Sequence, residues 1–253
     1  MSDLIIDSLT MRFSGLVALD EVSFSVKENE IFSLIGPNGS GKTTLFNCIN
    51  GFNKPQNGTI NFYGENLLDK KTHHIIHSGI SRTFQNVQNI PFMTVLDNIL
   101  LGANSRIDTL GTIKRWVSRD QRKAEESMAL EIMDFLGMAN YEQKYMMGLP
   151  FGIQKLAEIA RALVSKPKLI LLDEPAAGMN DQETREIANI IRDIRDELGI
   201  TVLLVEHDMN LVMSISDQIC VLESGKVIAS GDPSVIKNDP KVIESYLGEP
   251  ADA

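Results

Sequence analysis

Residues 31–50 read IFSLIGPNGSGKTTLFNCIN, and this stretch decides the fold. Its apolar start, residues 31–35, has the character of a buried strand, and apolar side chains return at helical spacing from Leu45 onward. Between them, residues 36–43 fit the pattern G-x-x-x-x-G-K-[ST] without a mismatch. A strand, a glycine-rich loop and a helix in this order predict a phosphate-binding loop.

The residue types in this loop suit an anion. Glycines let the backbone curl so that several N–H groups point at one anion, and the following helix adds the positive end of its dipole. Lys42 supplies a charge for the outer phosphates, and the hydroxyl of Thr43 suits Mg²⁺. We expect the phosphate tail of a nucleotide to be bound by Gly36, Pro37, Asn38, Gly39, Ser40, Gly41, Lys42, Thr43 and Thr44.

The composition favours a globular α/β protein. The chain has 253 residues, 43% of them hydrophobic, which is enough for one large domain or one domain with a sub-domain. The net charge of −10 argues against a generally basic surface for nucleic acid. Cys48 and Cys220 lie in apolar segments, so we expect no disulfide framework. No signal peptide and no run long enough to span a membrane is recognisable, so work at a membrane would require docking on other chains.

Acidic side chains follow a second apolar run. Residues 169–172 are continuously apolar, which is typical of a strand covered on both faces, and Asp173 and Glu174 come directly after them. In a parallel sheet, the carboxyl end of such a strand lies beside the phosphate loop. We expect Asp173 to hold Mg²⁺, mostly through water, and Glu174 to polarise an attacking water. The alternative is a solvated pair of carboxylates at a strand end.

A histidine follows a third buried strand. Residues 201–205 predict this strand, and His207 comes two residues after it. An imidazole at the same sheet edge can contact a γ-phosphate and position the water. A histidine at a strand end is often purely structural, but its place after the carboxylate strand favours a catalytic role.

The rest of the chain alternates strands and helices around this centre. Residues 4–27 contain β-rich runs, whereas residues 87–165 are mostly helical in character. We predict an α/β fold of the P-loop NTPase type, with a mostly parallel sheet core, an N-terminal antiparallel β sub-domain and an inserted α-helical sub-domain. In this division of a single domain of residues 1–253, residues 1–86 and 166–253 form the RecA-like core and the β sub-domain, and residues 87–165 form the insertion.

Five segments together resemble a known family. They are the phosphate loop at residues 36–43, RTFQ at 82–85, LPFGIQ at 149–154, LDEP at 172–175 and EHD at 206–208. In order and spacing they resemble the ATP-binding subunits of ABC transporters, and the resemblance covers nearly the whole chain. The resemblance therefore implies an ATPase that uses ATP and Mg²⁺.

The resemblance also assigns roles to single residues. It implies that Gln85 senses the γ-phosphate and acts in catalysis with Glu174 and His207. It implies that Mg²⁺ is held by Thr43, Gln85 and Asp173.

Other parts of the ATP site follow from the same resemblance. Phe13 occupies the place where the family stacks an aromatic ring on adenine, although a half-buried strand aromatic is the alternative. The family acts as a head-to-tail pair, in which each ATP lies between one phosphate loop and the partner's Leu-Ser-Gly-Gly-Gln stretch. Here residues 149–153 read Leu-Pro-Phe-Gly-Ile, so Pro150 replaces the serine. The N–H groups of Gly152 and Ile153 remain as donors in trans. This subunit therefore relies on backbone donors, or it pairs with a second ATP-binding subunit whose stretch is intact.

Several phrases resemble one branch of the family, the importer ATPases for branched-chain amino acids and similar amides. Among them are EIARAL at 158–163, AAGMN at 176–180 and YLGE at 246–249. This resemblance implies two membrane permease subunits, a related second ATPase in a homo- or heterodimer, and indirectly a solute-binding protein, but no nucleic acid. The expected place is the cytoplasmic face of the cell membrane. The alternatives are the ATPase of a lipopolysaccharide-export-type system, a soluble non-transport ABC ATPase and an inactive structural partner.

Two surface features have two interpretations each. His73, His74 and His77 cluster on one helical stretch, but because no cysteine or carboxylate joins them, a solvated helix face is favoured over a metal site. The apolar residues at 87–93, with Phe92 among them, form either sub-domain core or part of a groove for a permease helix, and we favour the groove.

Overall fold

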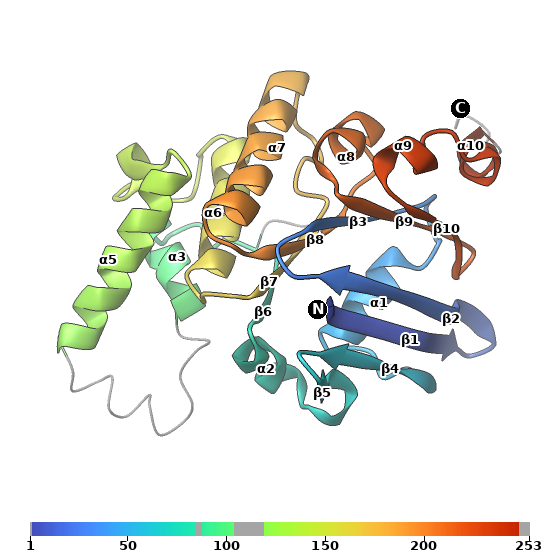
Figure 1. Ribbon diagram of the computed structural model, residues 1–253. Coiled ribbons are helices and arrows are strands. Elements are labelled where there is room, and N and C mark those ends of the chain that lie inside the picture. Colours follow the sequence, from blue (N-terminus) through green and yellow to red (C-terminus); the bar gives the residue numbers. More distant parts are fainter. Residues whose placement is uncertain (1, 84–87, 104–118, 248–253) are drawn as a thin grey trace.

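The computed structural model describes residues 2–83, 88–103 and 119–247 (Figure 1). Within these ranges, the smaller sheet has the strand order β2-β1-β4-β5 and the larger one has the order β10-β9-β3-β8-β7-β6. The strands are β1 (Ser2–Phe13), β2 (Leu16–Lys27), β3 (Ile31–Ile35), β4 (Asn57–Phe62), β5 (Glu65–Asn66), β6 (Ile80–Arg82), β7 (Leu169–Asp173), β8 (Thr201–Val205), β9 (Gln218–Glu223) and β10 (Lys226–Gly231). The helices are α1 (Lys42–Ile49), α2 (Thr72–Ile75), α3 (Val95–Ala103), α5 (Arg119–Phe135), α6 (Phe151–Leu163), α7 (Asp181–Asp196), α8 (Met209–Ile215), α9 (Pro233–Ile236) and α10 (Pro240–Leu247).

The larger sheet is mostly parallel, as predicted. β3 runs parallel to β8 and β9, β7 runs parallel to β8 and β6, and β10 pairs antiparallel with β9. Every residue of β3, β7 and β8 is buried, because the sheet is covered on both faces. Leu171 and Leu203 pack toward α1 and the smaller sheet, whereas Leu172 and Leu204 pack toward α6, α7 and α8.

The smaller sheet is antiparallel, as predicted for the N-terminal part. β1 pairs with β2 and with β4, and this sheet lies across α1 in Figure 1. Its apolar face, with Leu4, Ile6 and Val22, packs with Phe46 of α1 in one core. β2 is one continuous strand, although it contains Glu21 in a left-handed conformation with φ 53°.

Helices α3, α5 and α6 lie together at one side of the larger sheet (Figure 1). They share a core with α7 through buried side chains such as Ile99, Met133 and Ala160. A threonine directly before the apolar residues of α3 predicts a helix cap, and Thr94 forms one: its hydroxyl accepts the N–H of Asp97 at 3.0 Å. No helix among the described residues is both long and apolar enough to cross a bilayer.

One prediction about core packing is wrong. The apolar spacing of Ile187, Ile191 and Ile194 in the sequence predicts that Leu198 also faces inward, but this residue is 42% exposed. The helix ends at Asp196, so Leu198 lies beyond its last turn and does not continue the apolar stripe of Ile187, Ile191 and Ile194. Gly199 follows with φ 64°, the left-handed conformation in which a glycine commonly ends a helical segment.

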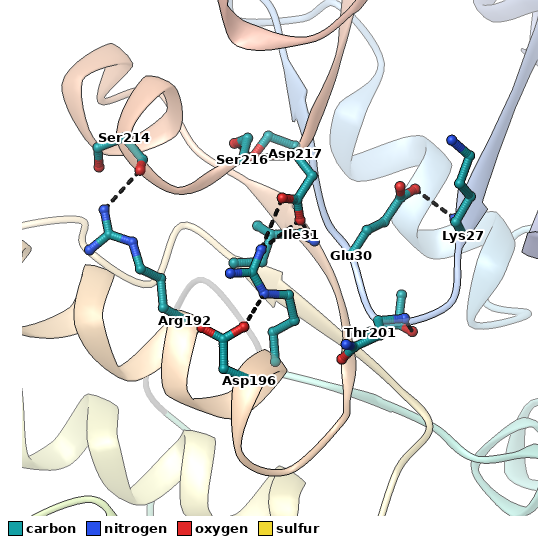
Figure 2. Close-up of polar contacts among 12 residues, drawn as sticks. Lys27, Glu30, Ile31, Arg192, Asp196, Thr201, Ser214, Ser216 and Asp217 are labelled. Atoms are coloured by element: carbon teal, nitrogen blue, oxygen red, sulfur yellow. Dashed lines mark hydrogen bonds and ion pairs between the residues drawn. The ribbon is translucent and has the colours of Figure 1, made fainter.

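A polar network, drawn in Figure 2, lies at the amino end of β3, whereas the phosphate loop follows the carboxyl end of this strand. Asp217 accepts the N–H of Ile31, which opens β3, at 2.8 Å, and its other contact is the guanidinium of Arg195 at 2.7 Å. Beside it, Glu30 accepts the N–H of Lys27 at 2.6 Å. The network joins α7 to the start of β3 through Asp217.

Candidate active site

The phosphate loop, residues 36–41, joins the carboxyl end of β3 to the first residue of α1. Gly36 has φ 148°, and a Cβ there would lie 2.0 Å from the carbonyl oxygen of Leu222 in β9. Gly41 has φ 109°, and a Cβ there would lie 2.6 Å from the carbonyl oxygen of Ala18 in β2. Both ends of the loop therefore lie against neighbouring backbone, and glycine alone permits this approach.

The side chain of Lys42 reaches back into the loop. It is the first residue of α1 and only 9% exposed, and its Nζ donates to the carbonyl oxygens of Gly36 at 2.6 Å and Pro37 at 2.9 Å. The N–H groups of a helix's first turn have no partner within the helix, and the dipole is positive there. The loop thus combines an ammonium group with main-chain donors, which is a suitable site for an anion.

A hollow of about 580 Å³ opens over this loop. This volume is within the range of small-molecule and cofactor sites. Three segments that are distant in sequence meet here: the end of β1 with Phe13, the loop, and the end of β7 with Glu174. Phe13 is 43% exposed at this wall. The lining residues are Phe13, Leu16, Val17, Ala18, Asn38, Gly39, Ser40, Gly41, Lys42, Thr43, Thr44, Glu174 and Ser224.

Asp173 is the last residue of β7 and is 4% exposed. One of its oxygens, Oδ2, accepts Nη2 of Arg82 at 2.7 Å. Its backbone N–H donates to the hydroxyl of Thr83 at 3.3 Å. A carboxylate at this depth is therefore neutralised by a buried guanidinium.

Glu174 follows directly and leaves the strand in an unusual conformation. Its φ of 49° is in the left-handed region, which non-glycine residues rarely adopt. Its N–H donates to the carbonyl oxygen of Val205 in β8 at 2.9 Å, and its side chain lines the hollow. The turn directs Glu174 away from the sheet and toward the phosphate loop.

His207 lies at the same sheet edge but does not line the hollow. It comes two residues after β8, and its side chain is 66% exposed. The nearest carboxylate oxygen, Oε2 of Glu206, is 3.8 Å from its Nδ1. The imidazole is thus free to turn toward a ligand held at the loop.

Gly152 and Ile153 lie apart from this hollow. They are in the first turn of α6, whose cap is Pro150, and the N–H of Gln154 donates to the carbonyl oxygen of Pro150 at 3.2 Å. Both residues line a separate depression, together with Met179 and Glu183. The structure thus separates them from the chain's own phosphate loop, and a role toward a ligand would be in trans.

Gln85 lies outside the described residues, and so do its neighbours Phe84 and Val87. The strand that leads to it ends at Arg82, and Thr83 is 6% exposed. The three histidines expected on a solvated helix face are exposed there on and just after α2. Within the described part of the chain, no group of three or more His, Cys, Asp or Glu side chains is placed to hold a metal ion.

The sequence does not predict the contacts of some residues in the site. Arg82 is noted above only as part of the RTFQ segment, but its guanidinium donates both to Asp173 and to Oδ1 of Asn47 in α1, each at 2.7 Å. Asn180 caps α7: its Oδ1 accepts the N–H groups of Gln182 and Glu183. The cap has a sequence signal, Asn followed three residues later by Glu.

Comparison with known proteins places the chain in a family. Residues 19–177 match the family model for ABC transporters, and residues 226–252 match the one for branched-chain amino acid ATP-binding cassette transporters. The high-affinity branched-chain amino acid transport ATP-binding protein LivG of Salmonella typhimurium is 41% identical over 249 residues, which cover 97% of this chain and 98% of LivG. The corresponding protein BraF of Pseudomonas aeruginosa is 40% identical, with 96% and 97% covered.

Solved structures agree. The ADP conformation of MJ1267, an ATP-binding cassette of an ABC transporter, has a TM-score of 0.87 and 35% identity, and the match covers 98% of this chain and 100% of MJ1267. A dimeric structure of MJ0796, a bacterial ABC transporter cassette, has a TM-score of 0.78 and 26% identity, with 91% and 98% covered. A family model that spans more than half of the chain, and relatives that match almost all of it, show that this chain belongs to the ABC transporter family and is one of its ATP-binding cassettes.

Proposed function

We propose that this cassette binds and hydrolyses ATP as a subunit of an importer for branched-chain amino acids or related amides. One observation carries the choice of solute: relatives about as long as this chain, and 40–41% identical to it, are named for branched-chain amino acid transport. The match of residues 226–252 to a model of the same branch supports it independently. Nothing in the site contacts a solute, so the choice rests on this similarity.

In this proposal, the hollow over the phosphate loop receives ATP. The main-chain N–H groups of residues 36–44 and the ammonium of Lys42 bind the phosphates, and Phe13 at the rim stacks on the adenine. The carbonyl contacts of Lys42 keep its Nζ within the loop, so little side-chain entropy remains to be lost when phosphate binds.

Oxygen donors from α1 and from the carboxyl end of β7 suit a Mg²⁺ ion. The Asp173 carboxylate and the Thr43 hydroxyl are hard oxygen donors of the type that Mg²⁺ prefers, and Gln85 would add an amide oxygen. When bound, Mg²⁺ neutralises charge on the phosphate oxygens. Glu174 accepts a proton from the attacking water, and His207 contacts the γ-phosphate from the next strand.

A second ATP-binding subunit completes the site in trans. The first-turn N–H groups of α6 at Gly152 and Ile153 would face the partner's γ-phosphate, and the partner is either a second copy or a related chain. The dimer of MJ0796 is a precedent for a pair of cassettes. Pro150 has neither a hydroxyl nor an N–H at this place, so backbone groups must supply the contact.

The insertion that we define as residues 87–165 would bind the permease. Backbone pairing joins residues 91–95 to residues 144–147, and this pair of segments exposes large apolar side chains. Phe92 is 76% exposed, Tyr145 63% and Met147 62%. An apolar surface of this kind suits a helix docked in a groove. The cassette would then lie on the cytoplasmic face of the membrane and respond indirectly to a solute-binding protein.

The test is reconstitution with the candidate permease subunits and solute-binding protein in vesicles. ATP-dependent uptake of labelled leucine is expected. Phe92→Asp should leave ATP binding intact but abolish the stimulation of hydrolysis by the permeases. Phe52→Asp is a matched control, since Phe52 is also exposed, at 57%, but lies next to α1. Uptake of no amino acid by a complex that assembles and hydrolyses ATP would refute the proposed solute class, and export of a lipid-linked saccharide would establish the alternative.

A further inference from the structure

A buried carboxylate lies between the two loops that carry Glu174 and His207. Glu206 follows β8, and the residue is 1% exposed. Its two oxygens have different partners: Oε1 accepts the N–H of Ala176 at 2.8 Å, and Oε2 accepts the N–H of His207 at 3.0 Å. One side chain thus joins the loop after β7 to the loop after β8.

The first of these loops needs such a contact. Glu174 has φ 49°, a conformation that is unfavourable for a residue with a Cβ. It persists because the backbone is held on both sides, by the bond from Glu174 N–H to the Val205 carbonyl at 2.9 Å and, two residues later, by the bond from Ala176 N–H to Glu206. The turn also closes on itself through the bond from Ala177 N–H to the Glu174 carbonyl at 3.2 Å, and the bond from Ala176 N–H ties it to the loop after β8.

The chemistry of the contact requires a carboxylate. Two main-chain donors approach two different oxygens, and a carboxylate can accept at both. A glutamine side chain has the same shape but offers one oxygen and one NH₂ group. One of the two main-chain N–H groups would then face the NH₂ group, which is a donor and cannot accept it. Burial raises the pKa of Glu206, and the N–H groups of Ala176 and His207 act in the opposite direction by favouring the charged form.

We propose that Glu206 is a positioning residue for ATP hydrolysis, whose two carboxylate oxygens hold the Glu174 loop and the His207 loop in one fixed relation. It acts through these loops and does not itself contact the nucleotide. The proposal rests on the roles proposed above for Glu174 and His207. It adds one requirement to those roles: the placement of both Glu174 and His207 depends on the carboxylate of Glu206.

The test is Glu206→Gln, which conserves size and removes one acceptor. Positioning predicts a kcat lower by about tenfold or more, because a small misplacement of reacting groups has large effects. The affinity for ATP should stay within about twofold, because the phosphate loop is not touched. Glu206→Asp keeps the charge but shortens the reach, so its kcat should fall as well.

The matched control is Glu30→Gln. Glu30 is also buried, at 7% exposure, and accepts one main-chain N–H, that of Lys27, but it lies at the opposite ends of the strands. We expect the kcat and the ATP affinity of this variant to stay close to those of the parent. All assays are run at a temperature at which each variant is folded by circular dichroism.

The outcomes separate the two proposals. If Glu174→Gln and His207→Ala abolish hydrolysis while Glu206→Gln keeps the parental kcat, the positioning role is refuted and the site stands. If Glu206→Gln lowers kcat only as far as Glu30→Gln does, the effect is one of stability and the role is again refuted. A parental kcat in Glu206→Asp would also refute the positioning role, because the shorter side chain cannot hold both loops in the same relation. Normal hydrolysis by Glu174→Gln would overturn the proposed site itself.

Discussion

Arg82→Met tests the buried ion pair at the end of β7. The guanidinium donates to Asp173 at 2.7 Å and to Asn47 at 2.7 Å, and the two charged side chains are 6% and 5% exposed. The guanidinium carbon of Arg82, Cζ, also lies 5.3 Å from the centre of the Phe46 ring. Methionine replaces much of the aliphatic packing, so the variant chiefly leaves the Asp173 carboxylate buried without this cation.

Removing one partner of a buried pair costs about 3–5 kcal/mol of unfolding free energy. At roughly 2–4 °C per kcal/mol for a chain of this size, the melting temperature should fall by about 6–20 °C. Arg195→Met is the matched control, because its pair with Asp217 is more exposed, at 19% and 43% for the two side chains. An exposed pair contributes about 1 kcal/mol or less.

The assay is thermal unfolding with and without Mg²⁺ and ATP. If Asp173 holds the ion, Mg²⁺–ATP should recover more stability in Arg82→Met than in the parent, because the ion replaces the missing cation at the same carboxylate. A melting temperature lowered no more than in Arg195→Met would refute the energetic argument. Equal recovery in variant and parent would contradict the assignment of Asp173 to Mg²⁺.

Two further predictions concern the start of α6 and a buried glutamate. Pro150→Ser adds a hydroxyl donor, and since one preorganised donor is worth up to about 3 kcal/mol in a transition state, the ATPase rate should rise; an unchanged rate would show that the hydroxyl is not needed. Burial raises the pKa of Glu30 in the folded state. Its contribution to stability is therefore present below the ordinary glutamate pKa and is lost as pH rises through the higher one. Urea titrations give the unfolding free energy of the parent and of Glu30→Gln at each pH. The parent value minus the variant value should decrease as pH rises from the ordinary glutamate pKa through the raised pKa of Glu30. A difference that stays constant with pH would contradict this prediction.

The sequence predicts those parts of the fold that depend on neighbouring residues. The phosphate loop, the covered strand before Asp173 and the cap at Thr94 each depend on a short stretch whose pattern has one physical solution. The order of these stretches also predicts a parallel sheet, because strand and helix alternate. The hollow that joins Phe13, the loop and Glu174 then follows from the topology.

Contacts between distant side chains could not be predicted in this way. Arg82 and Asp173 are 91 residues apart, and Ala176 and Glu206 are 30 apart, so their pairing depends on strand register. The left-handed turn at Glu174 has no local signal, since glutamate does not favour it. Leu198 shows the opposite error, because an apolar period was extended beyond the residue at which α7 ends.

The most direct measurement is ATP binding to purified Lys42→Ala by equilibrium titration, with Lys241→Ala, a change at an exposed lysine of α10, as control. The ammonium of Lys42, which lies 2.6 Å from the Gly36 carbonyl oxygen, is the group proposed to bind the phosphates. A charged hydrogen bond of about 1.5–3 kcal/mol predicts an affinity lower by at least about tenfold, with no change in the control. Parental affinity and parental hydrolysis in Lys42→Ala would contradict the account at its centre.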